Sequence, residues 1–161
     1  MSDAGESTGR TKTGTFLVTH VDEEAAVLRD VHDAEIHTLE GEHDLERHEV
    51  LDATLETGPA GVVWSLGAVE ARRTVPVEAS PESPTTLARD LAAEQSVGEV
   101  TTRERAGEGE LHVLTVPAER TDAAAADVRE DEETVARAAR LGVGRVEVRA
   151  ADGVVSVRYL P

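Results

Sequence analysis

Residues 13–77 constrain the fold most, because they hold five β-type runs in succession, separated by short polar or Gly/Pro turns. The runs cover residues 13–21, 25–32, 35–39, 49–56 and 62–77. Apolar and polar side chains alternate within them, which is typical of strands with one buried face. Gly67 indicates a bulge that would help the sheet to bend. Five short strands at this spacing predict a small closed barrel.

The chain after residue 78 has a different period. Residues 79–84 contain two prolines and two serines and are expected to form a linker. Beyond them the pattern predicts a helix to about Gln95, a short helical piece at 99–105, a strand at 111–116 and a helical region at 121–141 that bends near Glu130. Asp152-Gly153 then predicts the turn of a β-hairpin.

These elements together predict an α+β protein. We expect a disordered tail at 1–12, a five-stranded OB-like β-barrel at 13–78, a linker at 79–84 and a small ααβαββ domain at 85–161.

The composition is strongly acidic, with 33 Asp and Glu against 16 Lys and Arg, a net charge of −17 and Lys12 as the only lysine. Hydrophobic residues make up 39% of the chain, too many for a disordered acidic polypeptide. Molar salt would screen the self-repulsion of such a chain, so we expect a halophilic, cytoplasmic protein. The chain has no cysteine for disulfides or thiolate chemistry, and no apolar run long enough for a membrane span is expected.

Four runs carry a resemblance to a known family: TGTFLVTH at 13–20, AVLRDVH at 26–32, GEGELHVLTVP at 107–117 and VVSVRYLP at 154–161. They resemble a haloarchaeal family catalogued as a domain of unknown function, and the likeness covers nearly everything after the tail. It implies a halophilic, cytoplasmic setting and transfers no functional residue. The layout of residues 13–75 is also similar to small OB-like barrels such as the TRAM domain, which bind RNA.

Few residues stand out as candidates for a site. Arg72 and Arg73 form a basic pair that could contact phosphate or another ligand, with Trp64 as a stacking partner, and Arg103 with Arg105 forms a second pair. His20, His32 and His37 fall on successive strands, but their irregular spacing predicts no metal site. No catalytic motif and no phosphate-binding loop is present, and we expect no cofactor.

The sequence therefore favours a non-catalytic binding module over an enzyme. The leading hypothesis is a protein–protein adaptor or accessory subunit, because apolar burial is not weakened by salt. The alternative is an RNA or ribonucleoprotein binder that uses the barrel. Molar salt removes most of the gain from phosphate contacts, and only three aromatic residues are available for stacking.

Overall fold

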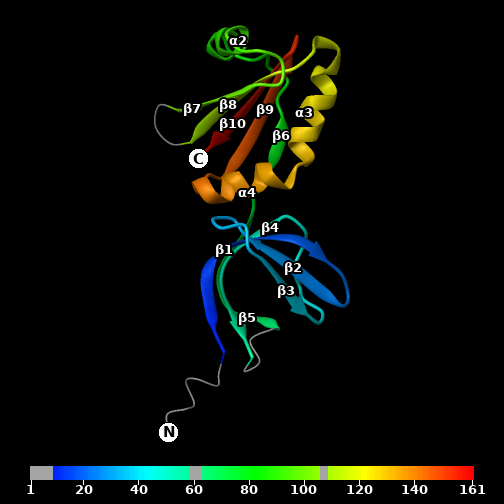
Figure 1. Ribbon diagram of the computed structural model, residues 1–161, viewed down its shortest axis with the longest axis vertical. Coiled ribbons are helices and arrows are strands. Elements are labelled where there is room, and N and C mark those ends of the chain that lie inside the picture. The colour runs from blue at the N-terminus through cyan, green and yellow to red at the C-terminus, as the bar shows by residue number, and fades with distance from the viewer. Residues whose placement is uncertain (1–8, 59–62, 106–108) are drawn as a thin grey trace. The chain divides into compact units, whose positions relative to one another are not determined.

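The computed structural model describes residues 9–58, 63–105 and 109–161 (Figure 1). These residues form ten β-strands in two sheets and three α-helices, so the predicted α+β class is confirmed. The chain divides into two compact units, Met1–Thr74 and Val75–Pro161, which we call the N-terminal and C-terminal units. Residues 1–8 of the predicted tail, the turn residues 59–61, and Gly107 and Glu108 lie outside the described residues.

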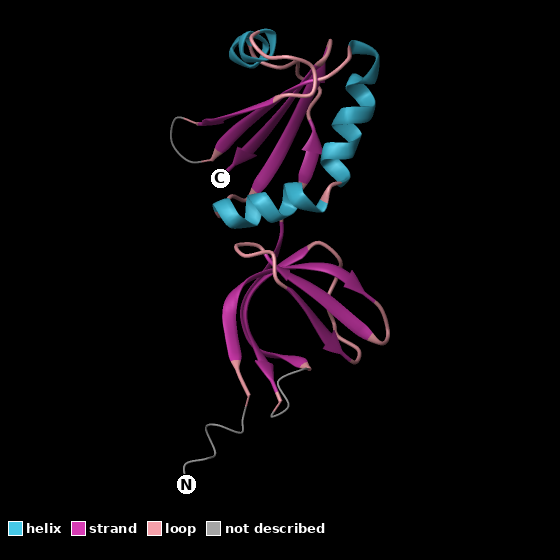
Figure 2. Ribbon diagram, viewed as in Figure 1, coloured by secondary structure: helices cyan, strands magenta, loops and turns pink. Residues whose placement is uncertain are grey.

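The N-terminal unit is built from strands and loops, whereas the helices of the described residues belong to the C-terminal unit (Figure 2). The sheet of the N-terminal unit has the strand order β1-β2-β3-β5-β4, and β4 pairs with β1 to close it. The pairing of β3 with β5 is the shortest join, a parallel bridge between Leu39 and Trp64. The strands are β1 (Thr11–Val21), β2 (Ala25–Asp30), β3 (Ile36–Glu40), β4 (Glu49–Thr57) and β5 (Trp64–Thr74).

Alternation along these strands fills the interior of the closed sheet with apolar side chains. The buried cluster consists of Phe16, Val18, Ala26, Leu28, Leu39, Leu45, Leu51, Ala53 and Leu55. Trp64, the first residue of β5, is half-buried and packs against this cluster. Gly67 lies where β5 crosses β4 closely: a Cβ there would meet the Thr54 carbonyl oxygen at 2.9 Å. The register between β4 and β5 shifts nearby, which fits the predicted bulge.

The C-terminal unit has one five-stranded sheet in the order β6-β9-β10-β8-β7. α2 packs on one face, against Leu111, Val113 and Val154. α3 contacts β6, β9 and β10 (Figure 1). The elements are β6 (Val77–Ala79), α2 (Thr86–Ala93), β7 (Val100–Glu104), β8 (Glu110–Thr115), a 3-10 turn (Ala118–Arg120), α3 (Thr121–Glu130), α4 (Glu132–Leu141), β9 (Arg145–Ala151) and β10 (Val154–Leu160).

The element order of this unit corrects the predicted ααβαββ arrangement at two places. Residues 99–105 were expected to be helical, but Val100–Glu104 forms β7 and pairs antiparallel with β8. β-Branched Val100, Thr101 and Thr102 favour a strand, and a neighbouring strand is available to pair with them. A further strand, β6, precedes α2.

The boundary between the units also differs from the predicted linker at 79–84. The two compact units divide between Thr74 and Val75. Val77–Ala79 pairs in parallel with Val146–Val148 of β9, and the Ser80 amide donates to the Val148 carbonyl. Thr11 and Lys12, placed in the predicted tail, pair with Glu56 and Leu55 and so belong to β1.

Two local predictions in the C-terminal unit are confirmed. The helical region breaks where a bend was expected: α3 ends at Glu130, and Asp131 caps α4 by accepting a hydrogen bond from the Glu133 amide. β9 and β10 form the expected hairpin around Asp152 and Gly153, which both adopt positive φ angles.

Candidate functional site

The three residues predicted as ligand contacts lie on β5, but the structure does not present them together as a free binding surface. Arg72 is held by Glu49: its Nε donates to Oε2 at 2.6 Å and its Nη2 donates to Oε1 at 2.9 Å. The same guanidinium donates to the Asp44 carbonyl at 3.0 Å. The bond from Arg72 holds the pKa of Glu49 below its usual value. A bidentate partner thus already occupies the donors that would bind phosphate. Arg73 is half-buried.

Trp64 belongs to a row of three rings in edge-on contact that extends into the core. Its ring contacts the buried His37 edge-on, with centroids 4.7 Å apart, and His37 in turn contacts Phe16 at 5.9 Å. The Arg10 guanidinium lies 5.7 Å from the centre of the Trp64 ring. Phe16 is fully buried. These contacts leave little aromatic surface for stacking against a base.

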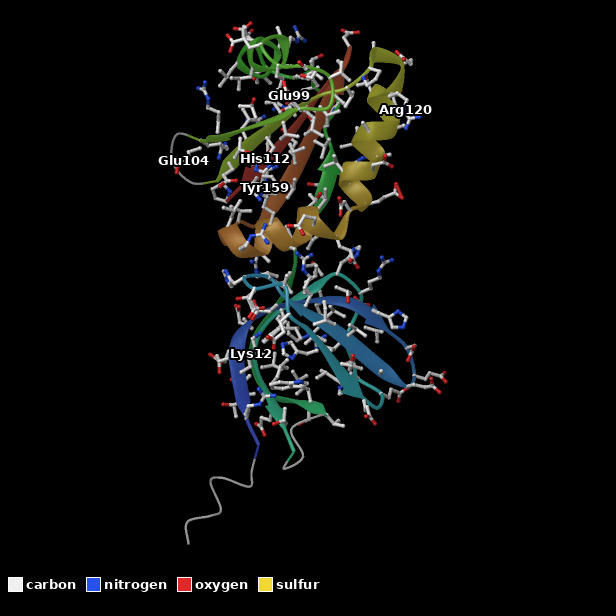
Figure 3. The ribbon with its side chains drawn as sticks, in the orientation of Figure 1. Lys12, Glu99, Glu104, His112, Arg120 and Tyr159 are labelled. Atoms are coloured by element: carbon white, nitrogen blue, oxygen red, sulfur yellow. The ribbon has the colours of Figure 1, made fainter. Side chains whose placement is uncertain are left out.

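The only lysine, Lys12, is the centre of a polar network on β1 (Figure 3). Its Nζ lies 2.8 Å from Asp33, 3.3 Å from Asp30 and 3.3 Å from Glu35. Burial opposes the charge, but the bonds to these carboxylates raise the pKa of Lys12 above its ordinary value. Lys12 is therefore committed to ion pairs.

The histidines of this unit do not gather around a common point. His37 is buried in the interior, where burial and the nearby Lys12 charge lower its pKa. His20 is exposed and bonds Asp22, and His32 is also exposed. Within residues 9–58, 63–105 and 109–161, no group of three histidine or carboxylate side chains is arranged to hold a metal ion.

The C-terminal unit carries a different feature, a groove beside α2 on the face of the sheet that this helix covers. Its volume is about 290 Å³. The lining residues come from α2, β7, β8 and β10: Thr85, Leu87, Arg103, Glu104, Arg105, Leu111, Ser156 and Arg158. Register explains how they meet, because Arg103 pairs with Leu111 and Leu111 pairs with Arg158 across neighbouring strands.

Charge in this groove is unusual for a chain of net −17, because three arginines line it. Arg158 donates to Glu147 at 2.9 Å, and Glu147 also accepts from Arg149 at 2.8 Å. Arg103 is exposed and has no ion-pair partner within the part of the chain that the structure describes. The positive charge of Arg103 at the groove is thus not neutralised by an acidic side chain of the described residues.

β7 is an edge strand that offers backbone groups on its outer side. It pairs with β8 only. The Arg105 amide donates to Gly109 and the Thr115 amide donates to Glu99, so the alternation directs the backbone of Thr101 and Arg103 towards β8. The N–H and C=O groups of Val100, Thr102 and Glu104 therefore point away from the sheet.

The opposite face of the sheet holds a closed polar cluster under α4. His112 and Tyr159, labelled in Figure 3, contact each other with ring centroids 4.9 Å apart. The His112 Nε2 lies 2.9 Å from Glu110 and 3.0 Å from the Nε of Arg137. Burial lowers the pKa of His112 and raises the pKa of Tyr159 to about 12. Because these groups bind one another, we interpret the cluster as packing rather than a reactive site.

Sequence reasoning identified Arg103 and Arg105 as a basic pair but missed the other members of the groove. Thr85, Leu87, Ser156 and Arg158 come from separate elements, so no local motif joins them. Reading residues 100–104 as a strand would have placed Arg103 on the same face as Thr101, and the alternation of Ser156 with Arg158 gives the matching face of β10.

A family model matches residues 12–150 of the chain, so the protein belongs to a family of unknown function, DUF5812. This confirms the resemblance to a family of unknown function. No curated protein and no solved structure matches the chain significantly. None of the helices in the described residues has both the length and the apolar character needed to cross a membrane.

Proposed function

We propose that this protein is a non-catalytic adaptor or accessory subunit that binds an extended segment of a partner protein along β7. The observation that carries the proposal is the outer edge of this strand, which pairs with no other strand among the described residues and where the backbone groups of Val100, Thr102 and Glu104 point outward. Alternating donors and acceptors at strand spacing match the backbone of another extended chain, the recognition mode known as β-strand addition.

Exposed apolar side chains next to this edge support the proposal. Leu87 at the start of α2 is 49% exposed, Val97 in the loop before β7 is 62% exposed and Val100 on β7 is 52% exposed. A partner strand beside β7 would cover part of this surface. Burial of apolar area provides an association energy that molar salt does not weaken.

The other strand edges are less suited to the addition of a partner strand. The strands of the N-terminal unit pair within a sheet that closes on itself. β6, at the other edge of the C-terminal sheet, has only three residues and is contacted by α3. β7 is therefore the edge on which an added strand gains most.

RNA binding through the N-terminal unit is the weaker candidate. The side chains that it would use, Trp64 and Arg72, already contact His37 and Glu49. Capture of RNA instead of protein in the experiment below would reverse this preference.

The same proposal includes the barrel type, the division into domains and the cellular environment. We take the closed sheet of the N-terminal unit as an OB-like barrel and the two compact units as separate domains. The net charge of −17 with a single lysine suits a halophilic, cytoplasmic protein.

The test replaces one outward N–H without changing the pairing of β7 with β8. Thr102→Pro removes a donor from the free edge, where proline is tolerated in a strand. The control Thr102→Val keeps the N–H and changes only the side chain. In pull-downs at molar KCl, a protein retained by the parent chain and by Thr102→Val should bind Thr102→Pro about tenfold more weakly or worse. Equal retention by both variants, with equal melting temperatures, would show that the β7 edge is not the docking site.

A further inference from the structure

The groove lined by Arg103, Arg105 and Arg158 is not explained by strand addition along β7. Three features of its lining point to one class of ligand: the arginines on its rim, the first turn of α2 at one end and a buried serine on its floor.

Three arginines supply positive charge to the groove. Arg103 lies on β7, Arg105 follows the end of β7, and Arg158 lies on β10. Arg158 is shared with Glu147, whereas Arg103 has no ion-pair partner in the described residues. Glu104 is the acidic residue of the lining, but strand alternation directs its side chain to the face opposite Arg103. Guanidinium groups on a cavity rim favour carboxylate and phosphate groups, which they bind in bidentate geometry.

The first turn of α2 adds donors at the same place. Thr85 is the N-cap, and its Oγ1 accepts from the Ala88 amide, so its hydroxyl hydrogen is still available to a ligand. The amides of Thr86 and Leu87 have no acceptor inside the helix, and the positive end of the helix dipole lies here. Thr85 and Leu87 both line the groove.

Ser156 adds a polar group from β10 to the lining of the groove. The residue is 1% exposed, and no side-chain hydrogen bond joins its hydroxyl to another described residue. Because the hydroxyl is not used within the fold, it can donate to a group bound in the groove. An anion in the groove would accept this hydrogen bond.

We propose that the groove binds a small organic oxyanion, with its charged head between Arg103, Ser156 and the first turn of α2. Leu87 and Leu111 form the apolar part of the lining and would contact a short hydrocarbon body. A volume of about 290 Å³ suits a small metabolite rather than a nucleotide or a folded domain. Carboxylate and phosphate monoester heads share the required chemistry.

The experiment titrates the full chain with butyrate, acetate and inorganic phosphate at constant KCl, and follows backbone amide shifts by NMR. Saturable shifts at Leu87, Arg103 and Ser156 are expected. Tighter binding of butyrate than acetate would assign a carboxylate with an apolar body, and tighter binding of phosphate would assign a phosphate ligand. Shifts that stay linear for all three anions would overturn the proposal.

Two variants separate binding from folding. Arg103→Gln should weaken binding roughly 10- to 100-fold, as loss of a charge-assisted hydrogen bond does. Ser156→Ala should weaken it as well, yet leave the melting temperature of the ligand-free chain unchanged, because the hydroxyl bonds no other described side chain. A lower melting temperature with unchanged binding would mean that Ser156 is structural and would contradict its role.

The matched control is Arg120→Gln. Arg120 is exposed in the same unit, lies in the 3-10 turn before α3, where Figure 3 labels it, and does not line the groove. This variant should bind the anion like the parent chain. Thr102→Pro, which tests strand addition, leaves every groove side chain in place and should also bind it. The two proposals can therefore fail independently.

Discussion

The two units of this protein differ in what their sheet edges and arginines leave available to a partner. In the N-terminal unit, the sheet closes on itself, Arg72 is bound by Glu49, and Lys12 is surrounded by three carboxylates. In the C-terminal unit, β7 ends the sheet with one neighbouring strand among the described residues, Arg103 has no ion pair within them, and Ser156 lines a groove next to both.

This difference bears on which unit we propose to bind a partner. A group that is already satisfied inside its own unit must lose a bond before it can gain an intermolecular one, whereas an unsatisfied group gains from any suitable partner. We therefore propose that the N-terminal unit serves structural stability and the C-terminal unit serves recognition.

The largest expected effect tests the structural half of this comparison. Phe16→Ala removes a fully buried ring from the closed sheet and should lower the free energy of unfolding by about 3–5 kcal/mol. Leu87→Ala, at a side chain 49% exposed beside the groove, should cost less than about 0.5 kcal/mol.

Urea unfolding at fixed KCl measures both changes. Fluorescence of Trp64, the only tryptophan, reports on the N-terminal unit, and circular dichroism follows the helices of the C-terminal unit. Equal losses in the two variants would remove the division between a structural and a binding unit.

A smaller effect should come from salt. The melting temperature should rise between low and molar KCl, because salt screens the repulsion within a chain of net charge −17. The ion pairs around Lys12 and Arg72 act in the other direction, since screening weakens attraction too. A melting temperature that is flat or falls across this range would mean that these pairs dominate, and would contradict the halophilic setting.

The sequence was sufficient where local chemistry decides the structure. The Asp152-Gly153 turn needs two positive φ angles, and the helix break at Glu130 follows from a capping aspartate, so both could be predicted from a few neighbouring residues. Strand alternation likewise predicted five strands before residue 78, which the structure has as β1 to β5.

The sequence was insufficient where pairing with a strand far away in the chain decides the local structure. Val100–Glu104 becomes a strand because β8 lies beside it, and Val77–Ala79 becomes one because β9 pairs with it. The groove depends on the same long-range pairing: Ser156 and Arg103 lie far apart in the chain and meet only through β8 and β10. No spacing of residues in the sequence predicts that Ser156 and Arg103 line the same groove.

Amide hydrogen exchange at β7 tests the central claim most directly. In the free chain, the outward amides of Val100, Thr102 and Glu104 should exchange faster than the inward amides of Thr101 and Arg103. Adding the partner retained at molar KCl should protect the outward set and leave the N-terminal unit unchanged. Protection that appears on β5 around Trp64 and Arg72, with β7 unaffected, would contradict the assignment of recognition to the C-terminal unit.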